Sequence, residues 1–157
     1  MMASKLIIGA NSKIVREISN QLEDFDFVSH TAIDAINFSK YQFIFLFSWS
    51  FKSLQMNIRN IELVPPEKLV FISSVAVFSA LSRKQFARYP KDKLHAEKIA
   101  FGQGSRILRI GMWNSKFVQS VYNKFFSTGP NKLVSTLNNY SNDSDVILNC
   151  LDVESGS

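Results

Sequence analysis

The sequence of 157 residues predicts an α/β fold, in which helices flank a doubly wound parallel sheet. Strand-like and helix-like segments alternate along the whole chain, which is the order that parallel strands with helical crossovers require. Several strand-like segments are continuous apolar runs, such as 43–47, and such runs are typical of strands buried on both faces. With 46% hydrophobic and 20% charged residues, the chain can bury one core. We therefore expect a single domain over residues 1–157.

The elements follow from periodicity and from breaking residues. Helices are expected where apolar residues recur every three or four positions, as Ile14, Ile18 and Leu22 do. Pro65 and Pro66 end one such helix. Strands are predicted over 5–9, 25–29, 43–48, 68–73, 106–110 and 146–151. Helices are predicted over 12–22, 31–38, 52–63, 89–101 and 117–125. A polar loop is predicted over 138–144.

Composition excludes several classes of protein. No apolar run approaches the roughly 20 residues that span a bilayer, and the first residues do not read as a secretory signal. The single cysteine, Cys150, excludes an intrachain disulfide and a cysteine-based zinc site, and we expect it to be a buried, inert thiol.

The net charge of +5 favours anionic partners. The basic residues do not alternate with aromatic ones, so nucleic acid is not favoured. We expect a cytoplasmic protein.

Three residue types that suit carbonyl and alcohol chemistry occur in a fixed order. Tyr89 and Lys93 are four residues apart and share a helical face. A cation beside a phenol favours the phenolate, so it lowers the pKa of the tyrosine. Ser73 and Ser74 close the strand upstream. The alternative is that Tyr89 and Lys93 only form the first turn of an amphipathic helix, where Pro90 is tolerated.

Four segments, read together, carry a family resemblance. They are KLIIGAN at 5–11, VFISSVAVF at 70–78, YPKDKLHAEKIA at 89–100 and ILRIG at 107–111. In this order they resemble the short-chain dehydrogenase/reductase superfamily, and within it the extended branch of nucleotide-sugar epimerases, dehydratases and 4-keto-sugar reductases. The resemblance implies a Rossmann-like fold, NAD or NADP as cofactor, and a nucleotide-linked sugar as substrate. It also implies a role in the synthesis of surface polysaccharides.

The resemblance also implies roles for individual residues. Ser74 would hydrogen-bond the substrate oxygen, and Tyr89 would be the proton donor and acceptor. Lys93 would lower the pKa of Tyr89 and hold the cofactor ribose. Hydride would pass between the nicotinamide and a sugar carbon. Ser73 points to the other face of its strand, so we expect it to be structural.

The cofactor turn departs from the family pattern GxxGxxG. Gly9 is kept, but Ser12 and Val15 stand in place of the second and third glycines. Ser12 is suited to cap the helix and to bond a phosphate, and Lys13 to add a phosphate contact. The alternative is a turn that no longer binds a dinucleotide. No acidic residue closes the second strand, and no Arg replaces it, so the choice between NAD and NADP stays open. The expected cofactor-binding residues are Gly9, Asn11, Ser12, Lys13, Ser48 and Lys93.

Other candidates lie outside these motifs. Arg83, Lys84 and Arg88 precede Tyr89, and we predict that they grip the diphosphate of the substrate, although a solvated basic loop is the alternative. Trp49 is expected to pack in the core rather than to stack on a cofactor ring. We expect Arg109 to be structural and His95 to be exposed.

The resemblance leaves the substrate region short. Extended members are normally much longer, so residues 111–157 read as a reduced remnant of the substrate-binding region. Aromatic residues there either cover the sheet or form the contact of a homo-oligomer; they are Phe117, Tyr122, Phe125 and Phe126. Two functions remain open: an NAD(P)-dependent oxidoreductase, epimerase or dehydratase, or a catalytically silent Rossmann-like protein that binds a nucleotide or another subunit.

Overall fold

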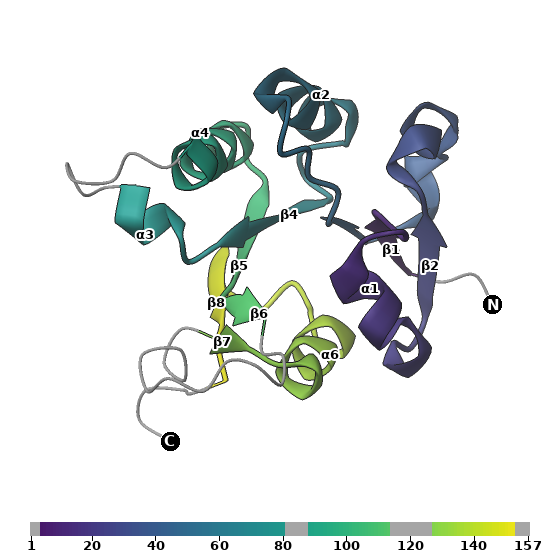
Figure 1. Ribbon diagram of the computed structural model, residues 1–157. Coiled ribbons are helices and arrows are strands. Elements are labelled where there is room, and N and C mark those ends of the chain that lie inside the picture. Colours follow the sequence, from purple (N-terminus) through teal and green to yellow (C-terminus); the bar gives the residue numbers. More distant parts are fainter. Residues whose placement is uncertain (1–3, 81–87, 114–126, 153–157) are drawn as a thin grey trace.

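Six parallel strands form the centre of the molecule (Figure 1). The computed structural model describes residues 4–80, 88–113 and 127–152. The strands lie in the order β2-β1-β3-β4-β5-β8, and a short second sheet pairs β6 with β7. Their bounds are β1 (Lys5–Ile8), β2 (Phe25–Val28), β3 (Phe43–Leu46), β4 (Leu69–Ser74), β5 (Arg106–Ile110), β6 (Met112–Trp113), β7 (Ser127–Thr128) and β8 (Ile147–Cys150). The predicted α/β fold with a parallel sheet is confirmed.

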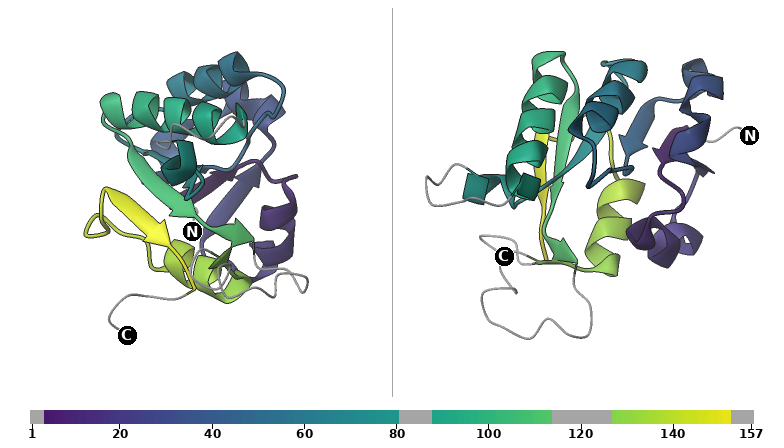
Figure 2. Two further views of the ribbon diagram at one scale, coloured as in Figure 1. Left: turned by 60° about the vertical axis from the view of Figure 1, so that its left-hand side comes forward. Right: turned by 45° about the horizontal axis from the view of Figure 1, so that its top comes forward.

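Helices cover both faces of the sheet, as Figures 1 and 2 show. One layer holds α2 (Leu54–Leu63) and α4 (Arg88–Gly102), with the 3-10 helices η2 (His30–Ala35) and η3 (Phe38–Lys40). The other holds α1 (Lys13–Ile18), followed by the 3-10 helix η1 (Ser19–Gln21), and α6 (Pro130–Asn138). The short α3 (Val77–Ala80) follows β4. Because side chains alternate along a strand, Leu6 and Ile8 pack on the first layer and Ile7 packs on the second.

The topology fixes where a ligand site is possible. β2 pairs with one side of β1, and β3 pairs with the other side. The chain therefore reverses its direction of winding at β1, and the carboxyl ends of β1 and β3 lie next to each other at that point. In open parallel sheets, such a switch point is the usual place for a ligand to bind.

The expected strands all form, but some helical segments differ from the expectation. Residues 31–38 give 3-10 turns rather than an α-helix. The sequence pattern missed α6, whose Leu133 and Leu137 are buried one turn apart within a polar stretch. It also missed α3 and the pair β6 and β7. The helix expected over 117–125 lies outside the described residues.

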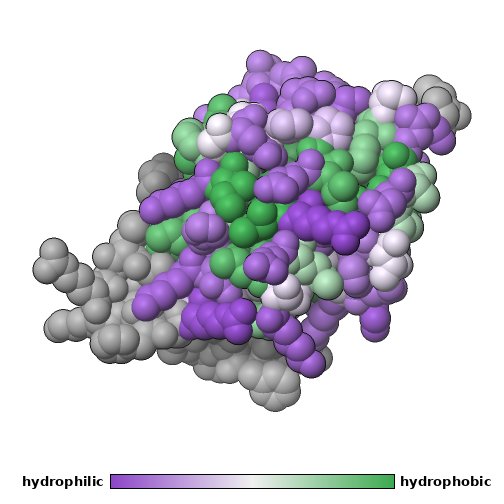
Figure 3. All heavy atoms as spheres, turned by 90° about the horizontal axis from the view of Figure 1, so that it is seen from above, coloured by the Kyte–Doolittle hydropathy of each residue, from purple (hydrophilic) through white to green (hydrophobic). Residues whose placement is uncertain are grey.

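The outer surface of the α2 and α4 layer is mixed in character. Seen from above Figure 1, apolar atoms reach the surface between hydrophilic ones (Figure 3). Met56 and Leu63 of α2 and Phe101 of α4 are among the exposed large hydrophobic residues. None of the helices in the described ranges combines the length and the apolar character that crossing a membrane requires.

Candidate active site

A cavity of about 640 Å³ opens at the switch point of the sheet. Its walls come from the turn after β1, the loop after β3, the end of β4, and the helices α2 and α4. The predicted residues Gly9, Asn11, Ser12 and Lys13 line the cavity, and so do Ser48, Tyr89 and Lys93. No carboxylate occurs among its lining residues within the described ranges. The same ranges hold no group of three or more His, Cys, Asp or Glu side chains that is arranged to hold a metal ion.

Gly9 is required where β1 turns into α1. Its φ is +109°, a conformation that side chains disfavour, and a Cβ there would lie 2.8 Å from the backbone nitrogen of Ser48. The backbone nitrogens of Gly9 and Ala10 both donate to the carbonyl of Val28, at 2.9 and 3.1 Å. The turn is therefore tied to β2 and pressed against the loop after β3.

The residues that replace the family glycines have structural roles. The hydroxyl of Ser12 accepts a hydrogen bond from the backbone nitrogen of Val15 at 3.2 Å, so Ser12 caps α1 as predicted. Val15 is 1% exposed and belongs to the core of the α1 and α6 layer. The side chains of Asn11 and Lys13 are exposed at the rim of the cavity. These are the polar groups that this turn offers to a ligand.

Tyr89 and Ser74 meet at the start of α4. Burial raises the pKa of Tyr89 above its ordinary value, and the nearby hydroxyl of Ser74 has a smaller effect in the opposite direction. The rise is the opposite of the direction that we expected from Lys93. The Oγ of Ser74 also accepts a hydrogen bond from the backbone nitrogen of Ala76 at 3.1 Å. Tyr89 is therefore a protonated phenol at neutral pH.

Lys93 is buried beside β4 rather than extended into solvent. Its Nζ donates to the carbonyl oxygen of Ile72 at 2.9 Å and lies 4.1 Å from the ring centroid of Trp49. Burial lowers the pKa of Lys93 to about 7, and the carboxylate of Glu97 acts in the opposite direction. An ammonium has three donors, so the contact with Ile72 leaves two for a ligand in the cavity.

Aromatic side chains enclose this lysine. Trp49 packs against the core of the α2 and α4 layer, which confirms the packing expected of it, and it also lines the cavity. Its ring meets that of Tyr89 edge to face, with 6.1 Å between the centroids. The ring of Phe51 stacks on that of Tyr89 with 5.4 Å between the centroids, yet Phe51 is 73% exposed. The sequence pattern gave no indication of Phe51.

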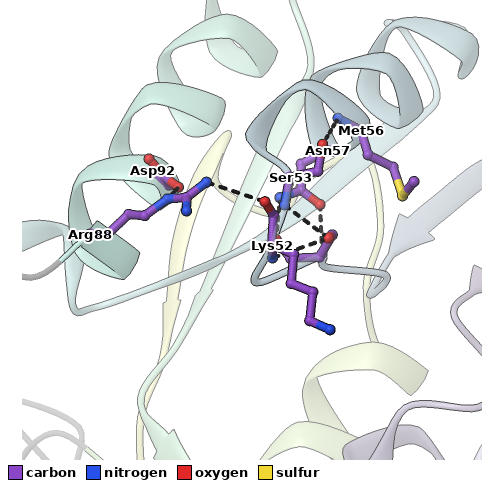
Figure 4. Close-up of polar contacts among 7 residues, drawn as sticks. Lys52, Ser53, Met56, Asn57, Arg88 and Asp92 are labelled. Carbon is purple, nitrogen blue, oxygen red and sulfur yellow. Dashed lines mark hydrogen bonds and ion pairs between the residues drawn. The ribbon is translucent and has the colours of Figure 1, made fainter.

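A buried amide holds the loop that carries these aromatic residues. The Oδ1 of Asn57 accepts from the backbone nitrogen of Ser50 at 2.7 Å, and its Nδ2 donates to the carbonyl of Ser50 at 2.9 Å. Ser53 caps α2 by accepting from the backbone nitrogen of Met56 (Figure 4). Asn57 was not predicted from the sequence. Its position one turn before the apolar Ile61 is the signal that would have placed it on the buried face.

Arg88 contacts the protein instead of the cavity. Its Nε pairs with the Oδ2 of Asp92 at 3.0 Å, and its guanidinium donates to the carbonyl of Lys52 at 3.4 Å (Figure 4). Arg88 thus links the start of α4 to the loop before α2, and it is not among the lining residues. Arg83 and Lys84 lie outside the described residues. The diphosphate contacts expected of these three residues stay predictions.

A buried network lies behind the site. The Oγ of Ser73 donates to Glu97 at 2.6 Å, and Arg109 forms an ion pair with the same carboxylate. Ser73 and Arg109 are therefore structural, as expected, although Ser73 also lines the cavity. Glu97 was missed, and its position one turn after Lys93 is the signal that would have found it. His95 is exposed and Cys150 is buried, as predicted.

The fold is similar to that of solved Rossmann-fold proteins. A short-chain dehydrogenase/reductase (wide type) from Veillonella parvula, in complex with NADP, aligns with a TM-score of 0.64 at 10% identity, over 99% of this chain and 96% of that one. A Rossmann-fold NAD(P)-binding family protein from Shigella flexneri aligns with a TM-score of 0.56 at 14% identity, over 88% of this chain and 85% of that one. At these identities the likeness shows the fold.

A third solved structure is only partly covered. The capsular polysaccharide assembling protein CapF from Staphylococcus aureus aligns with a TM-score of 0.57 at 13% identity, over 93% of this chain and 52% of CapF. The chain thus spans about half the length of CapF. No protein-family model matches the sequence, and no curated protein is similar to it.

Proposed function

We propose that the protein is an NAD(P)-dependent oxidoreductase of the short-chain dehydrogenase/reductase kind. One observation carries the proposal: a single cavity joins the Gly9 turn to Tyr89 and Lys93, which lie about 80 residues further along the chain. One ligand in this cavity can therefore contact both the Gly9 turn, which would bind the nucleotide, and Tyr89, which would transfer the proton. A dinucleotide-dependent reaction requires both contacts.

The residues present fit a dinucleotide. The cavity volume of about 640 Å³ is within the range of sites for small molecules and cofactors. Lys13 at the rim and Lys93 inside supply positive charge for phosphate and ribose groups. The Gly9 turn lets the backbone of 9–13 approach a pyrophosphate. A bound nicotinamide supplies the hydride donor or acceptor.

The protein side of the reaction is proton transfer. Burial keeps Tyr89 protonated, so in the reduction of a ketone its phenol gives a proton to the carbonyl oxygen, which becomes a hydroxyl. Ser74, whose hydroxyl is near enough to affect the pKa of Tyr89, shares the contact with the same oxygen. Lys93, when protonated, stabilises the phenolate that remains. In the oxidation direction Tyr89 takes the proton back.

The substrate that we propose is a nucleotide-linked sugar, and the reaction is a keto-sugar reduction, an epimerisation or a dehydration. The family resemblance of 70–78, 89–100 and 107–111 supports this choice, and so does the structural likeness to a protein of capsular polysaccharide assembly. A net charge of +5 suits a diphosphate-linked substrate. A cytoplasmic location and a homo-oligomer go with this proposal.

A second candidate function is a catalytically silent nucleotide-binding or subunit-interaction protein. One observation favours it: the ammonium of Lys93 already donates to Ile72 and is covered by the ring of Trp49. In that arrangement the lysine stabilises the loop after β3 instead of a cofactor ribose. The two candidates differ in turnover, because only the first needs the phenol of Tyr89.

The test is a titration of the purified protein with NADH and with NADPH, followed by nicotinamide fluorescence and by the melting temperature. Ligand at 100 times its dissociation constant stabilises the fold by about 2.7 kcal/mol. We expect micromolar binding, and turnover of a nucleotide-linked keto-sugar that Tyr89→Phe abolishes while cofactor binding is kept. If neither cofactor binds at millimolar concentration, the oxidoreductase proposal is wrong. Cofactor binding without turnover favours the silent protein.

A further inference from the structure

The side chain of Lys93 lies on the cavity wall without a charged partner. It is 6% exposed, and the ring centroids of Trp49 and Phe71 lie 4.1 and 5.1 Å from its Nζ. Over the described ranges, this Nζ takes part in no ion pair, and its hydrogen bond goes to a neutral group, the carbonyl oxygen of Ile72 at 2.9 Å. An amine enclosed by apolar groups loses the hydration that its charged form needs, and this is one way in which proteins make a lysine nucleophilic.

The acidic group one turn further along α4 does not supply the missing partner. The carboxylate of Glu97 accepts a hydrogen bond from the Oγ of Ser73 at 2.6 Å and forms an ion pair with Arg109. Burial therefore has the larger effect on the pKa of Lys93, which falls to about 7, and Glu97 opposes it only in part. At neutral pH about half of the Lys93 side chains are then neutral amines with a free lone pair.

The same cavity holds an acid that suits the chemistry of an amine with a carbonyl group. Tyr89 lines the cavity and lies four residues before Lys93, on the same face of α4. Burial raises the pKa of Tyr89, so its phenol keeps its proton at neutral pH. When an amine adds to a carbonyl, the hydroxyl of the addition product leaves as water only after it has gained a proton. A protonated phenol beside the amine can give that proton.

The rest of the cavity restricts the class of carbonyl compound. Over the residues that the structure describes, its lining carries Lys13 and His30 and no carboxylate. The turn after Gly9 also lines it, and the backbone of such a turn can approach a phosphate closely. Positive charge and an open backbone turn favour an anionic group, and a phosphate matches both.

We infer that Lys93 is a nucleophilic site at which a phosphorylated aldehyde condenses to an imine. The Nζ attacks the carbonyl carbon, and a C–N bond forms. The former carbonyl oxygen takes a proton from Tyr89 and leaves as water, and the phenolate takes back a proton from the nitrogen. The sum is amine plus aldehyde giving imine plus water, with no oxidant or reductant consumed. The protonated imine that forms on the way is a cation beside the ring of Trp49, which favours it.

This activity goes beyond the proposed function, because it needs neither a dinucleotide nor hydride transfer. It uses the neutral form of Lys93, whereas the oxidoreductase reaction uses the charged form. A carbonyl ligand and a dinucleotide cofactor would compete for the same cavity.

The test uses pyridoxal 5′-phosphate, an aldehyde that carries a phosphate. An equimolar amount is added to the purified protein at neutral pH, borohydride reduces any imine to a stable amine, and peptide mass analysis locates the label. We expect Lys93 to be labelled at least about tenfold more than the exposed Lys98 on the same helix, because an ordinary lysine is almost wholly protonated at this pH. Labelling of Lys93 at or below the level of Lys98 would overturn the inference, and this comparison needs no variant.

Two further comparisons test the parts of the site. Pyridoxal, which lacks the phosphate, should label Lys93 at least about tenfold less, and equal labelling by the two compounds contradicts the phosphate preference. Tyr89→Phe should slow the appearance of the imine absorption band at least about tenfold, since the acid is lost. An unchanged rate in Tyr89→Phe contradicts the role given to the phenol.

A matched pair of variants assigns the absorption band. Lys93→Arg keeps a cation but has no nucleophilic amine, so the band should disappear, whereas Lys98→Arg should keep it. A band that persists in Lys93→Arg shows that another lysine forms the imine, and the inference is then wrong.

The outcomes also separate this inference from the proposed function. If NADH or NADPH binds and supports turnover but Lys93 is not labelled preferentially, only the imine site is wrong. If Lys93 is labelled as expected but neither cofactor binds, the imine site stands and the oxidoreductase proposal is wrong.

Discussion

The ammonium of Lys93 lies 4.1 Å from the ring centroid of Trp49, on the wall of the cavity. Such a contact favours the charged lysine by about 0.5–2 kcal/mol, depending on its exposure to water. Burial acts against the charge and brings the pKa of Lys93 to about 7. The lysine therefore changes its charge near neutral pH, directly beside an indole ring, and two predictions depend on this relationship.

Tryptophan emission should report the charge of Lys93. We expect emission to titrate with a midpoint near the pKa of about 7, because an ammonium so close to Trp49 alters the field at the indole. The transition should disappear in Lys93→Met. Histidine is the residue type that in general changes its charge in this pH range, so the control removes both imidazoles in the double variant His30→Asn and His95→Asn. If that control removes the transition and Lys93→Met keeps it, the assignment to Lys93 is wrong.

Lys93 should also make stability depend on pH. Its pKa is about 7 in the folded protein and 10.5 when unperturbed, so between these values the unfolded chain binds more protons. The free energy of unfolding then rises with pH across this window, by roughly 3–5 kcal/mol in total. The free energy of unfolding of Lys93→Met, measured with urea, should lack this dependence on pH. The variant should therefore be more stable than wild type, and the difference should be largest below pH 7. Lys98→Met, an exposed position on the same helix, should follow wild type at every pH.

Gly9→Ala should destabilise the fold. The φ of +109° and the approach of 2.8 Å to the backbone nitrogen of Ser48 leave no room for a Cβ. We expect a loss of more than about 1 kcal/mol in the free energy of unfolding, measured with urea. Gly102→Ala is the matched control, because nothing lies within 4 Å of a Cβ there, and it should be neutral or slightly stabilising. Equal stability of the two variants would contradict the role given to Gly9.

Asn57→Ala should loosen the loop that carries Trp49 and Phe51. The change leaves the backbone nitrogen and carbonyl of Ser50 without their partner, at a cost of about 1–3 kcal/mol in unfolding free energy. Tryptophan emission should shift to longer wavelength, as Trp49 becomes more exposed to water. Gln55→Ala, on the exposed side of α2, is the control and should change neither quantity. A stable variant with unchanged emission would show that Asn57 does not hold the loop.

Much of the sheet could be predicted from local sequence, because each of its strands is a short run of mainly apolar residues between turns. The 3-10 turns of 30–40 and the helix α6 could not, since both are short and carry few apolar residues. What makes them regular is burial of Ile33 or Leu133 against the sheet, a contact with residues distant in the sequence. Asn57 was missed for a related reason, as a polar residue on a helical face that the pattern treats as apolar.

The sequence by itself determined the alternation of strands and helices, the glycine at the β1 turn, and the pairing of Tyr89 with Lys93 on one helical face. These depend on interactions between near neighbours and on backbone conformation. Only the tertiary structure decided that Lys93 turns toward Ile72 and Trp49, that burial raises the pKa of Tyr89, and that Arg88 donates to the carbonyl of Lys52. Desolvation and contacts across elements set these properties, and both depend on which parts of the chain the fold brings together.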